Sequence, residues 1–238
     1  MGSLMKTGQK KVVLFDIDGT LLETGGAGRE AFIRGLARVT GVRDELEYVS
    51  FAGNTDRNVL DQVMRMRGFQ LGKEDTRRVF EEIAVELKGL LRERPACEVA
   101  GAGRFVARLA EEGAAMGLVT GNIRECAFLK LGSVGLDSYF RFGGYGDDHA
   151  ERAKIARLAL AEAREAGIEV EEGFICLVGD TPFDVAAGLA VGVPVIGVAS
   201  GKFGEKALLE AGASVVVKDF LEADRLWQWM EEGAILNR

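Results

Sequence analysis

The sequence has few of the residues that build disulfide frameworks and zinc sites. It contains a single histidine and three cysteines, Cys97, Cys126 and Cys176, which are far apart and show no CxxC spacing. This pattern argues against both kinds of site and favours a reducing cytoplasm. The basic N-terminus is followed by only four apolar residues before Asp16, too few for a signal peptide or a membrane span. We therefore expect a cytoplasmic protein.

Proline is also scarce, with three in 238 residues, and acidic residues outnumber basic ones, which gives a formal net charge of −7. An acidic balance argues against binding a nucleic-acid backbone or an anionic membrane. We expect a monomer or homodimer without such partners. A small anionic substrate would need local positive charge or a metal ion.

Short, almost continuously apolar runs recur along the chain, as expected for strands buried on both faces of a parallel sheet. Helical patterns with apolar residues three and four apart lie between them. The alternation predicts an α/β fold with a doubly wound, Rossmann-like parallel sheet between two helix layers. The runs are "KVVLFD", "AAMGLVTGN", "GFICLVGD", "VPVIGVASG" and "ASVVVKD".

One interval interrupts this alternation. Residues 23–94 contain helical patterns but no convincing strand, and one pattern opens on a candidate N-cap, Asn54 or Thr55. We predict an α-helical domain at 23–94 inserted into an α/β core domain formed by 1–22 and 95–238.

Two acidic residues end the first apolar run, in "FDIDGT". Asp16 and Asp18 are two residues apart, so both can face one pocket, and Gly19 allows the chain to turn sharply. Carboxylates this close repel each other unless a cation lies between them or one is protonated. Either condition is useful in catalysis.

Polar residues also follow two later runs, where parallel sheets bind ligands. In "LVTGN", Thr120 and the amides after it could bind an anion at a helix start, or simply cap that helix. In "VGDTPFD", Asp180 and Asp184 could each simply interact with the dipole at a helix N-terminus. Together with Asp16 and Asp18, however, they form a set of hard oxygen ligands that suits Mg²⁺.

The motifs "DIDGT", "LVTGN" and "VGDTPFD", in this order, closely resemble those of the haloacid dehalogenase superfamily, whose members are mostly phosphatases. The resemblance covers residues 10–21 and 97–230, and the helical insertion resembles the superfamily's helical cap. It implies a Mg²⁺-dependent phosphatase acting on a small phosphorylated metabolite.

The resemblance implies a role for each acid. Asp16 is the expected nucleophile that forms an aspartyl-phosphate, and Asp18 the acid–base that exchanges a proton with the leaving group and water. Mg²⁺ is expected on Asp16, the backbone carbonyl of Asp18, and Asp180. Asp184 is expected to hold the metal site in place.

Phosphate is expected to bind Thr120 and the neighbouring Gly121 and Asn122, helped by a cation. Many relatives supply that cation from a Lys-Pro pair, but this chain reads "GYGDDHAERAKIARLAL" instead. Arg152 is favoured, because "DDHxxR" stretches occur in phosphoglycolate phosphatase-like relatives and a guanidinium can bind phosphate bidentately. Lys154 is the alternative.

The segment "FAGNTDRNVLDQ" resembles the "GxTD" cap segment of phosphoglycolate phosphatase-like members, which makes Thr55 and Arg57 candidate substrate contacts. Arg57 could read a substrate carboxylate or could simply be solvated. The lone His149 fits a solvated or loop-bracing role better than that of a base. We expect a phosphoglycolate-like or sugar phosphate substrate.

Other activities remain as alternatives. A dehalogenase lacks the second acid that Asp18 supplies, and the insertion has no histidine of the kind a sugar phosphomutase uses. A phospho-accepting receiver domain shares an acid pair, a threonine and a lysine at strand ends, but has no insertion. A binding protein that lost the chemistry is disfavoured, because every catalytic position holds a competent residue type.

Overall fold

A parallel sheet forms the centre of the molecule. The computed structural model describes residues 11–147, 149–168 and 174–236. Within them, six parallel strands have the order β5-β4-β1-β6-β7-β8, which places β1 next to β4 and β6. The strands are β1 (Lys11–Phe15), β4 (Ala115–Val119), β5 (Phe142–Gly144), β6 (Phe174–Gly179), β7 (Val195–Val198) and β8 (Val215–Val217).

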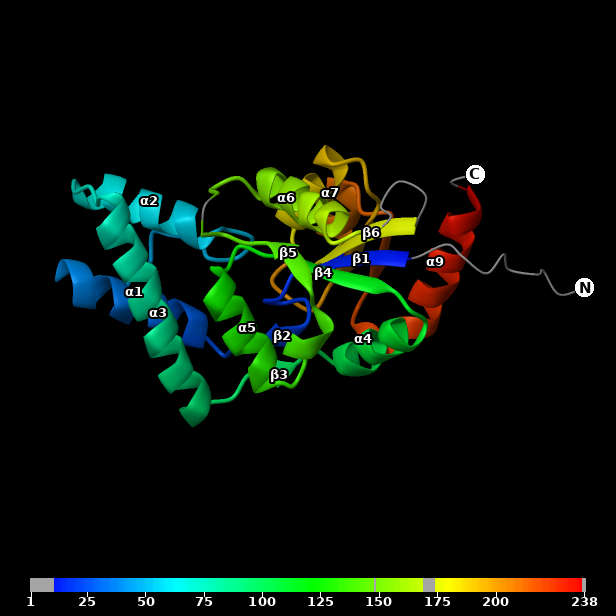
Figure 1. The fold of residues 1–238 in the computed structure, drawn as a ribbon, viewed down its shortest axis with the longest axis horizontal. Coiled ribbons are helices and arrows are strands. Elements are labelled where there is room, and N and C mark those ends of the chain that lie inside the picture. The colour runs from blue at the N-terminus through cyan, green and yellow to red at the C-terminus, as the bar shows by residue number, and fades with distance from the viewer. Residues whose placement is uncertain (1–10, 148, 169–173, 237–238) are drawn as a thin grey trace, which may run out of the picture.

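Helices cover both faces of this sheet (Figure 1). Successive residues of β1 alternate between two apolar cores: Val13 and Phe15 face one, Val12 and Leu14 the other. The first core is closed by α4 (Ala102–Glu111), α5 (Arg124–Ser133) and α9 (Ala223–Leu236). The second is closed by α6 (Arg152–Glu165), α7 (Pro182–Ala190) and α8 (Glu205–Ala211). This is the doubly wound architecture predicted from the sequence.

A helical insertion follows β1 and stands at one end of the molecule, at the other end from α9 (Figure 1). It contains α1 (Ala27–Thr40), α2 (Asp56–Arg67) and α3 (Lys73–Glu93). The chain leaves and re-enters the core through two short antiparallel strands, β2 (Leu22–Glu23) and β3 (Cys97–Glu98). They lie beside the predicted domain boundaries, which remain a prediction. Thr55 is the N-cap of α2, accepting a hydrogen bond from Asn58 N at 3.1 Å.

The sequence patterns did not predict β5, α8 or α9. Strand β5 is only three residues long, and two of them are the glycines Gly143 and Gly144. A Cβ at Gly144 would lie 2.1 Å from the carbonyl oxygen of Ile155, so this strand packs against α6 through bare backbone. None of the helices in the described part of the chain has the length and apolarity needed to cross a membrane.

Helices α1 and α3 pack closely at Gly35, which gives a prediction about stability. A Cβ there would lie 2.5 Å from the backbone nitrogen of Ile83, whereas a Cβ at Gly89 of α3 meets nothing within 4 Å. Both glycines lie within helices, where alanine is favoured by about 1 kcal/mol. We expect Gly89→Ala to stabilise the protein, and Gly35→Ala to destabilise it by roughly 1–3 kcal/mol because of overpacking. Urea unfolding measures both, and equal stabilisation would contradict this packing.

Candidate active site

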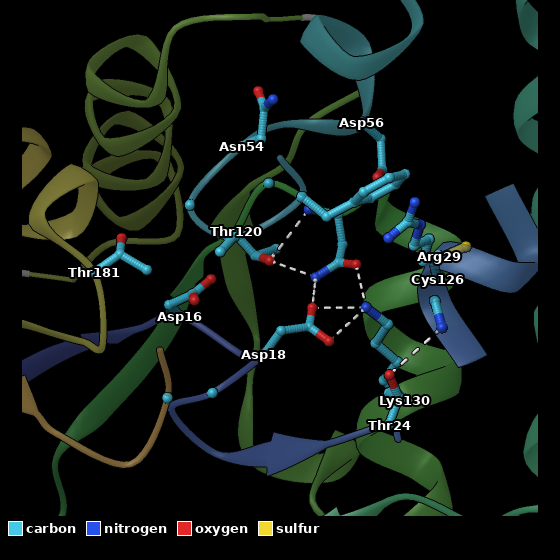
Figure 2. A pocket seen from close by; sticks show the side chains of 18 of the residues that line it. Asp16, Asp18, Thr24, Arg29, Asn54, Asp56, Thr120, Cys126, Lys130 and Thr181 are labelled. Atoms are coloured by element: carbon cyan, nitrogen blue, oxygen red, sulfur yellow. Dashed lines mark hydrogen bonds and ion pairs between the residues drawn. The ribbon is translucent and has the colours of Figure 1, made fainter. Parts of the chain in front are cut away.

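The candidate site lies at the carboxyl ends of three neighbouring strands. Asp16 follows β1, Thr120 follows β4 and Asp180 follows β6, and all three line a cavity of about 280 Å³. Asp18 lines the same cavity, as its spacing from Asp16 predicts. The helical insertion supplies other parts of the wall, including Arg29 (Figure 2).

Arg152, at the start of α6, contacts the expected nucleophile. Its Nη2 lies 2.5 Å from Asp16 Oδ1 and 2.8 Å from Asp184 Oδ1, and the Arg152 and Asp16 side chains are almost fully buried. The buried Nε has no hydrogen-bond partner among the described residues. Lys154 instead pairs with Glu151 at 2.9 Å and is half exposed. The structure therefore brings Arg152 to the site and leaves Lys154 at the surface.

Asp184 stabilises the start of α7 and also contacts Arg152. Its Oδ2 accepts hydrogen bonds from Thr181 N at 3.0 Å and Thr181 Oγ1 at 2.7 Å. Thr181 Oγ1 in turn accepts from Asp184 N at 3.3 Å, which completes a capping box. Its Oδ1 remains for Arg152. This fully buried side chain therefore caps the helix and contacts Arg152, while its role at a metal site stays a prediction.

Three carboxylates crowd beside Arg152. Asp16, Asp180 and Asp184 each offer an oxygen, and these oxygens all lie within 4.8 Å of one another. Burial, together with the charges of Asp184 and Asp18, raises the pKa of Asp16 to about 7 despite the attraction of Arg152. Burial and the charge of Asp16 raise the pKa of Asp180 to about 9. The single positive charge of Arg152 does not balance the negative charge of three carboxylates.

The backbone leaves space for this cluster. A Cβ at Gly19 would lie 2.4 Å from Asp180 Oδ2, and a Cβ at Gly201 would lie 1.9 Å from the same atom. Gly19 also has φ +78°, which glycine adopts without strain. Thr20 donates to Asp180 Oδ1 at 3.3 Å. Hard oxygen donors, excess negative charge and glycines around one carboxylate fit a divalent cation.

Thr120 is placed to donate a hydrogen bond. Its Oγ1 accepts from Asn122 N at 3.2 Å and from Asn122 Nδ2 at 2.8 Å, which leaves the hydroxyl hydrogen for a ligand. Gly121 allows the insertion to approach, because a Cβ there would lie 1.9 Å from Asn54 O. The Gly121 carbonyl accepts from Asp56 N at 2.7 Å.

Asn122 and Lys130 hold Asp18. Lys130 Nζ lies 2.7 Å and 2.6 Å from the two oxygens of Asp18, and Asn122 Nδ2 lies 2.7 Å from Oδ2. Sequence reasoning missed Lys130. A signal was present, because Lys130 lies four residues after Cys126 and three after Ala127, on the buried face of α5. A lysine on an apolar helix face needs a buried partner.

The predicted substrate contacts Thr55 and Arg57 do not line the cavity. Thr55 caps α2 and donates to Ala150 O at 3.3 Å, while Arg57 Nε pairs with Asp61 at 3.2 Å. His149 is also outside the cavity wall. The insertion reaches the cavity with other residues, among them Arg29 and Phe51, Asn54 and Asp56.

Asp56 joins the insertion to the core. Its Oδ2 accepts a hydrogen bond from Ile123 N, just before α5, at 2.9 Å, and Arg57 N donates to Gly146 O at 3.1 Å. Burial raises the pKa of Asp56 to about 6, although Lys130 opposes the shift. The start of α2 is therefore bonded to the loops after β4 and β5, and the insertion closes over the cavity.

Fold and site together define an α/β protein with a carboxylate cluster at the carboxyl ends of its strands and an inserted helical domain. Residues 13–198 match the model of the haloacid dehalogenase-like hydrolase family, and the chain belongs to this family. No curated protein sequence matches it significantly.

Solved structures share the fold at low identity. A hydrolase from Pseudomonas syringae is 22% identical with a TM-score of 0.68, covering 90% of this chain and 97% of its own. CbbY from Rhodobacter sphaeroides in complex with phosphate is 21% identical with a TM-score of 0.71, covering 90% and 96%. A structure described as a predicted phosphoglycolate phosphatase from Haemophilus somnus is 17% identical with a TM-score of 0.65, covering 93% and 99%.

Proposed function

We propose that the protein is a Mg²⁺-dependent phosphatase that hydrolyses a small phosphomonoester through an aspartyl-phosphate intermediate. The observation that carries the proposal is the buried contact between Asp16 and Arg152 at the carboxylate cluster, at the base of a cavity closed by the insertion. A carboxylate nucleophile and a guanidinium that can hold a phosphoryl oxygen are the two groups that phosphoryl transfer to an aspartate needs most.

In the first displacement, one Asp16 oxygen forms a bond to phosphorus while the bond from phosphorus to the ester oxygen breaks. Asp18 gives its proton to that leaving oxygen. In the second displacement, Asp18 takes a proton from water, whose oxygen attacks phosphorus and releases Asp16 and inorganic phosphate. Asp18 thereby regains the proton it lost.

Arg152 and Thr120 hold the phosphoryl group in this mechanism. Arg152 already contacts Asp16, and its unpartnered Nε is a further donor for a phosphoryl oxygen. The Thr120 hydroxyl can donate to another. Phosphoryl transfer depends mainly on positioning and on stabilising charge at these oxygens. Asn122 acts through Asp18 in our proposal, because its amide contacts Asp18.

The carboxylate cluster would hold the metal. Asp16, Asp180 and the backbone carbonyl of Asp18 are the proposed ligands, and Asp184 orients the cluster through Arg152 and Thr181. When bound, Mg²⁺ would neutralise charge on the phosphoryl oxygens and on the crowded acids. Mg²⁺ is preferred because it needs only a few carboxylates and retains several waters.

The substrate is proposed to be a small phosphorylated metabolite of the phosphoglycolate or sugar phosphate type. The cavity of about 280 Å³ leaves room for a compact leaving group beside the phosphate. Its wall includes Arg29 and Asn54 from the insertion, which can contact polar groups of the metabolite. A panel that contains 2-phosphoglycolate and sugar phosphates, ranked by kcat/KM, tests this choice.

Metal removal tests the proposed function. Protein treated with EDTA should release phosphate from p-nitrophenyl phosphate at least about 10²-fold more slowly, and added Mg²⁺ should restore the rate. Ca²⁺ should restore it poorly, since Ca²⁺ takes more ligands at longer distances than this small cluster supplies. Steady-state release of phosphate measures both. Turnover that is unchanged by EDTA would contradict the metal, and no turnover of any phosphomonoester would contradict the phosphatase.

A further inference from the structure

Lys130 is a buried ammonium group in the catalytic cavity for which the mechanism above has no role. It is only 4% exposed, and its Nζ contacts both carboxylate oxygens of Asp18 and, at 2.6 Å, Asn122 Oδ1. Burying a lysine is costly, and the group that compensates it here is the proposed acid–base.

The contact with Lys130 also determines how Asn122 faces Asp18. An amide has one acceptor and one donor end, and Lys130, which only donates, occupies the acceptor Oδ1. The donor Nδ2 therefore faces Asp18 Oδ2 at 2.7 Å, and it also reaches Thr120 Oγ1. Asp18 is thus bordered on this side by donors alone, as Figure 2 shows for the Lys130 and Asp18 contacts.

This arrangement determines where a proton on Asp18 can point. A protonated carboxyl group needs an acceptor for its O–H, and neither Lys130 Nζ nor Asn122 Nδ2 can accept. The carbonyl oxygen of Asp18 can stay on these donors, while the O–H must turn toward the open part of the cavity. The side chain of Asp18 is 41% exposed, compared with 5% for Lys130, so one side of it does face open space.

We infer that Lys130 is a positioning residue for proton transfer: with Asn122, it orients the Asp18 carboxyl so that its proton points at the leaving oxygen. Asp16 and Asp18 thus have separate cations, Arg152 for the nucleophile and Lys130 for the acid. The inference rests on the proposed function and deepens it.

The test compares leaving groups that need a proton with one that does not. The Lys130→Met variant is assayed with p-nitrophenyl, phenyl and benzyl phosphate, which are similar in shape and whose leaving oxygens become more basic in that order. The quantity compared is kcat/KM, because it covers only the steps up to aspartyl-phosphate formation. We expect benzyl phosphate to lose about 10²-fold and p-nitrophenyl phosphate less than about 10-fold.

A matched control removes another positive charge from the same cavity. Lys202 is exposed and lines the cavity wall, and Lys202→Met should change all three substrates by one common factor. Asp18→Asn serves as the reference for lost proton transfer and should show the same substrate order as Lys130→Met. Lys130→Gln is the second variant, which retains a polar side chain in case the methionine variant does not fold.

The outcomes separate the inference from the proposed function. A parallel loss with all three substrates in both Lys130 variants, or no loss, would overturn the positioning role, because a structural or phosphate-binding lysine does not distinguish leaving groups. A wild-type protein that hydrolyses none of them would instead overturn the phosphatase proposal. A selective loss in Lys130→Met and Lys130→Gln, absent in Lys202→Met, is the expected result.

Discussion

Asp16→Asn is expected to abolish steady-state phosphate release, with a loss of at least about 10³-fold in kcat. Asparagine has nearly the same shape as aspartate, but its amide is a poor nucleophile and cannot form an aspartyl-phosphate. Arg152 would keep its 2.8 Å contact with Asp184, and the crowded cluster would lose one negative charge. The variant should therefore remain folded, and the loss of activity should come from the missing nucleophile.

Two measurements distinguish this from unfolding or from a different nucleophile. Thermal unfolding of Asp16→Asn should stay close to that of the wild-type protein. Mass spectrometry after brief exposure to p-nitrophenyl phosphate should detect a phosphoryl group in Asp18→Asn, whose second displacement lacks a base, and none in Asp16→Asn. Residual turnover in Asp16→Asn above that of an Asp16→Ala protein would argue against a covalent role for Asp16.

The fold was largely predictable because buried parallel strands have a distinct composition. The runs around β1, β4, β6, β7 and β8 are apolar on both faces, and this pattern can be recognised without knowing which strands pair. Strand β5 could not be predicted in this way. Its three residues, with Gly143 and Gly144, are shaped by the close approach of Leu118 and Ile155, which is a tertiary contact.

The site was predictable where chain position alone places a residue. Asp16, Thr120 and Asp180 end neighbouring parallel strands, so their meeting follows from topology. Lys130 reaches the same cavity from within α5, and only the rotation of that helix against the sheet brings its Nζ to Asp18. A residue that reaches the site from within a helix can be assigned only with a structure, because the helix pattern does not determine how far its side chain lies from the site.

The residues that the insertion contributes to the cavity could not be predicted for the same reason. Arg57 was a reasonable substrate contact by resemblance, but the start of α2 bonds to the loops after β4 and β5 and leaves Arg57 beside Asp61, outside the cavity. Arg29, in α1, lines the cavity instead. How an inserted helix docks depends on particular hydrogen bonds, such as that from Ile123 N to Asp56, which sequence spacing does not encode.

Arg152→Ala should be far more damaging than Lys154→Ala, although the two cations are two residues apart. Removing Arg152 leaves Asp16 and Asp184 without their buried positive partner. Breaking a buried ion pair in this way should lower the free energy of unfolding by about 3–5 kcal/mol. It also removes a donor for the phosphoryl group, so kcat/KM should fall by about 10²–10³-fold. Lys154 pairs with Glu151 at the surface, and its loss should cost less than about 1 kcal/mol.

Chemical rescue separates the two effects of Arg152. Added guanidinium can enter the space left by the side chain of Arg152→Ala and restore part of kcat/KM, whereas Lys154→Ala should show no such response. Arg152→Lys keeps the charge but lacks the planar fork, and is expected to recover stability more than activity. Urea unfolding and kcat/KM for p-nitrophenyl phosphate give both quantities for each variant. A collapse of the rate in Lys154→Ala alone would reverse the assignment, because Lys154 would then have to leave Glu151 and reach Asp16 during turnover.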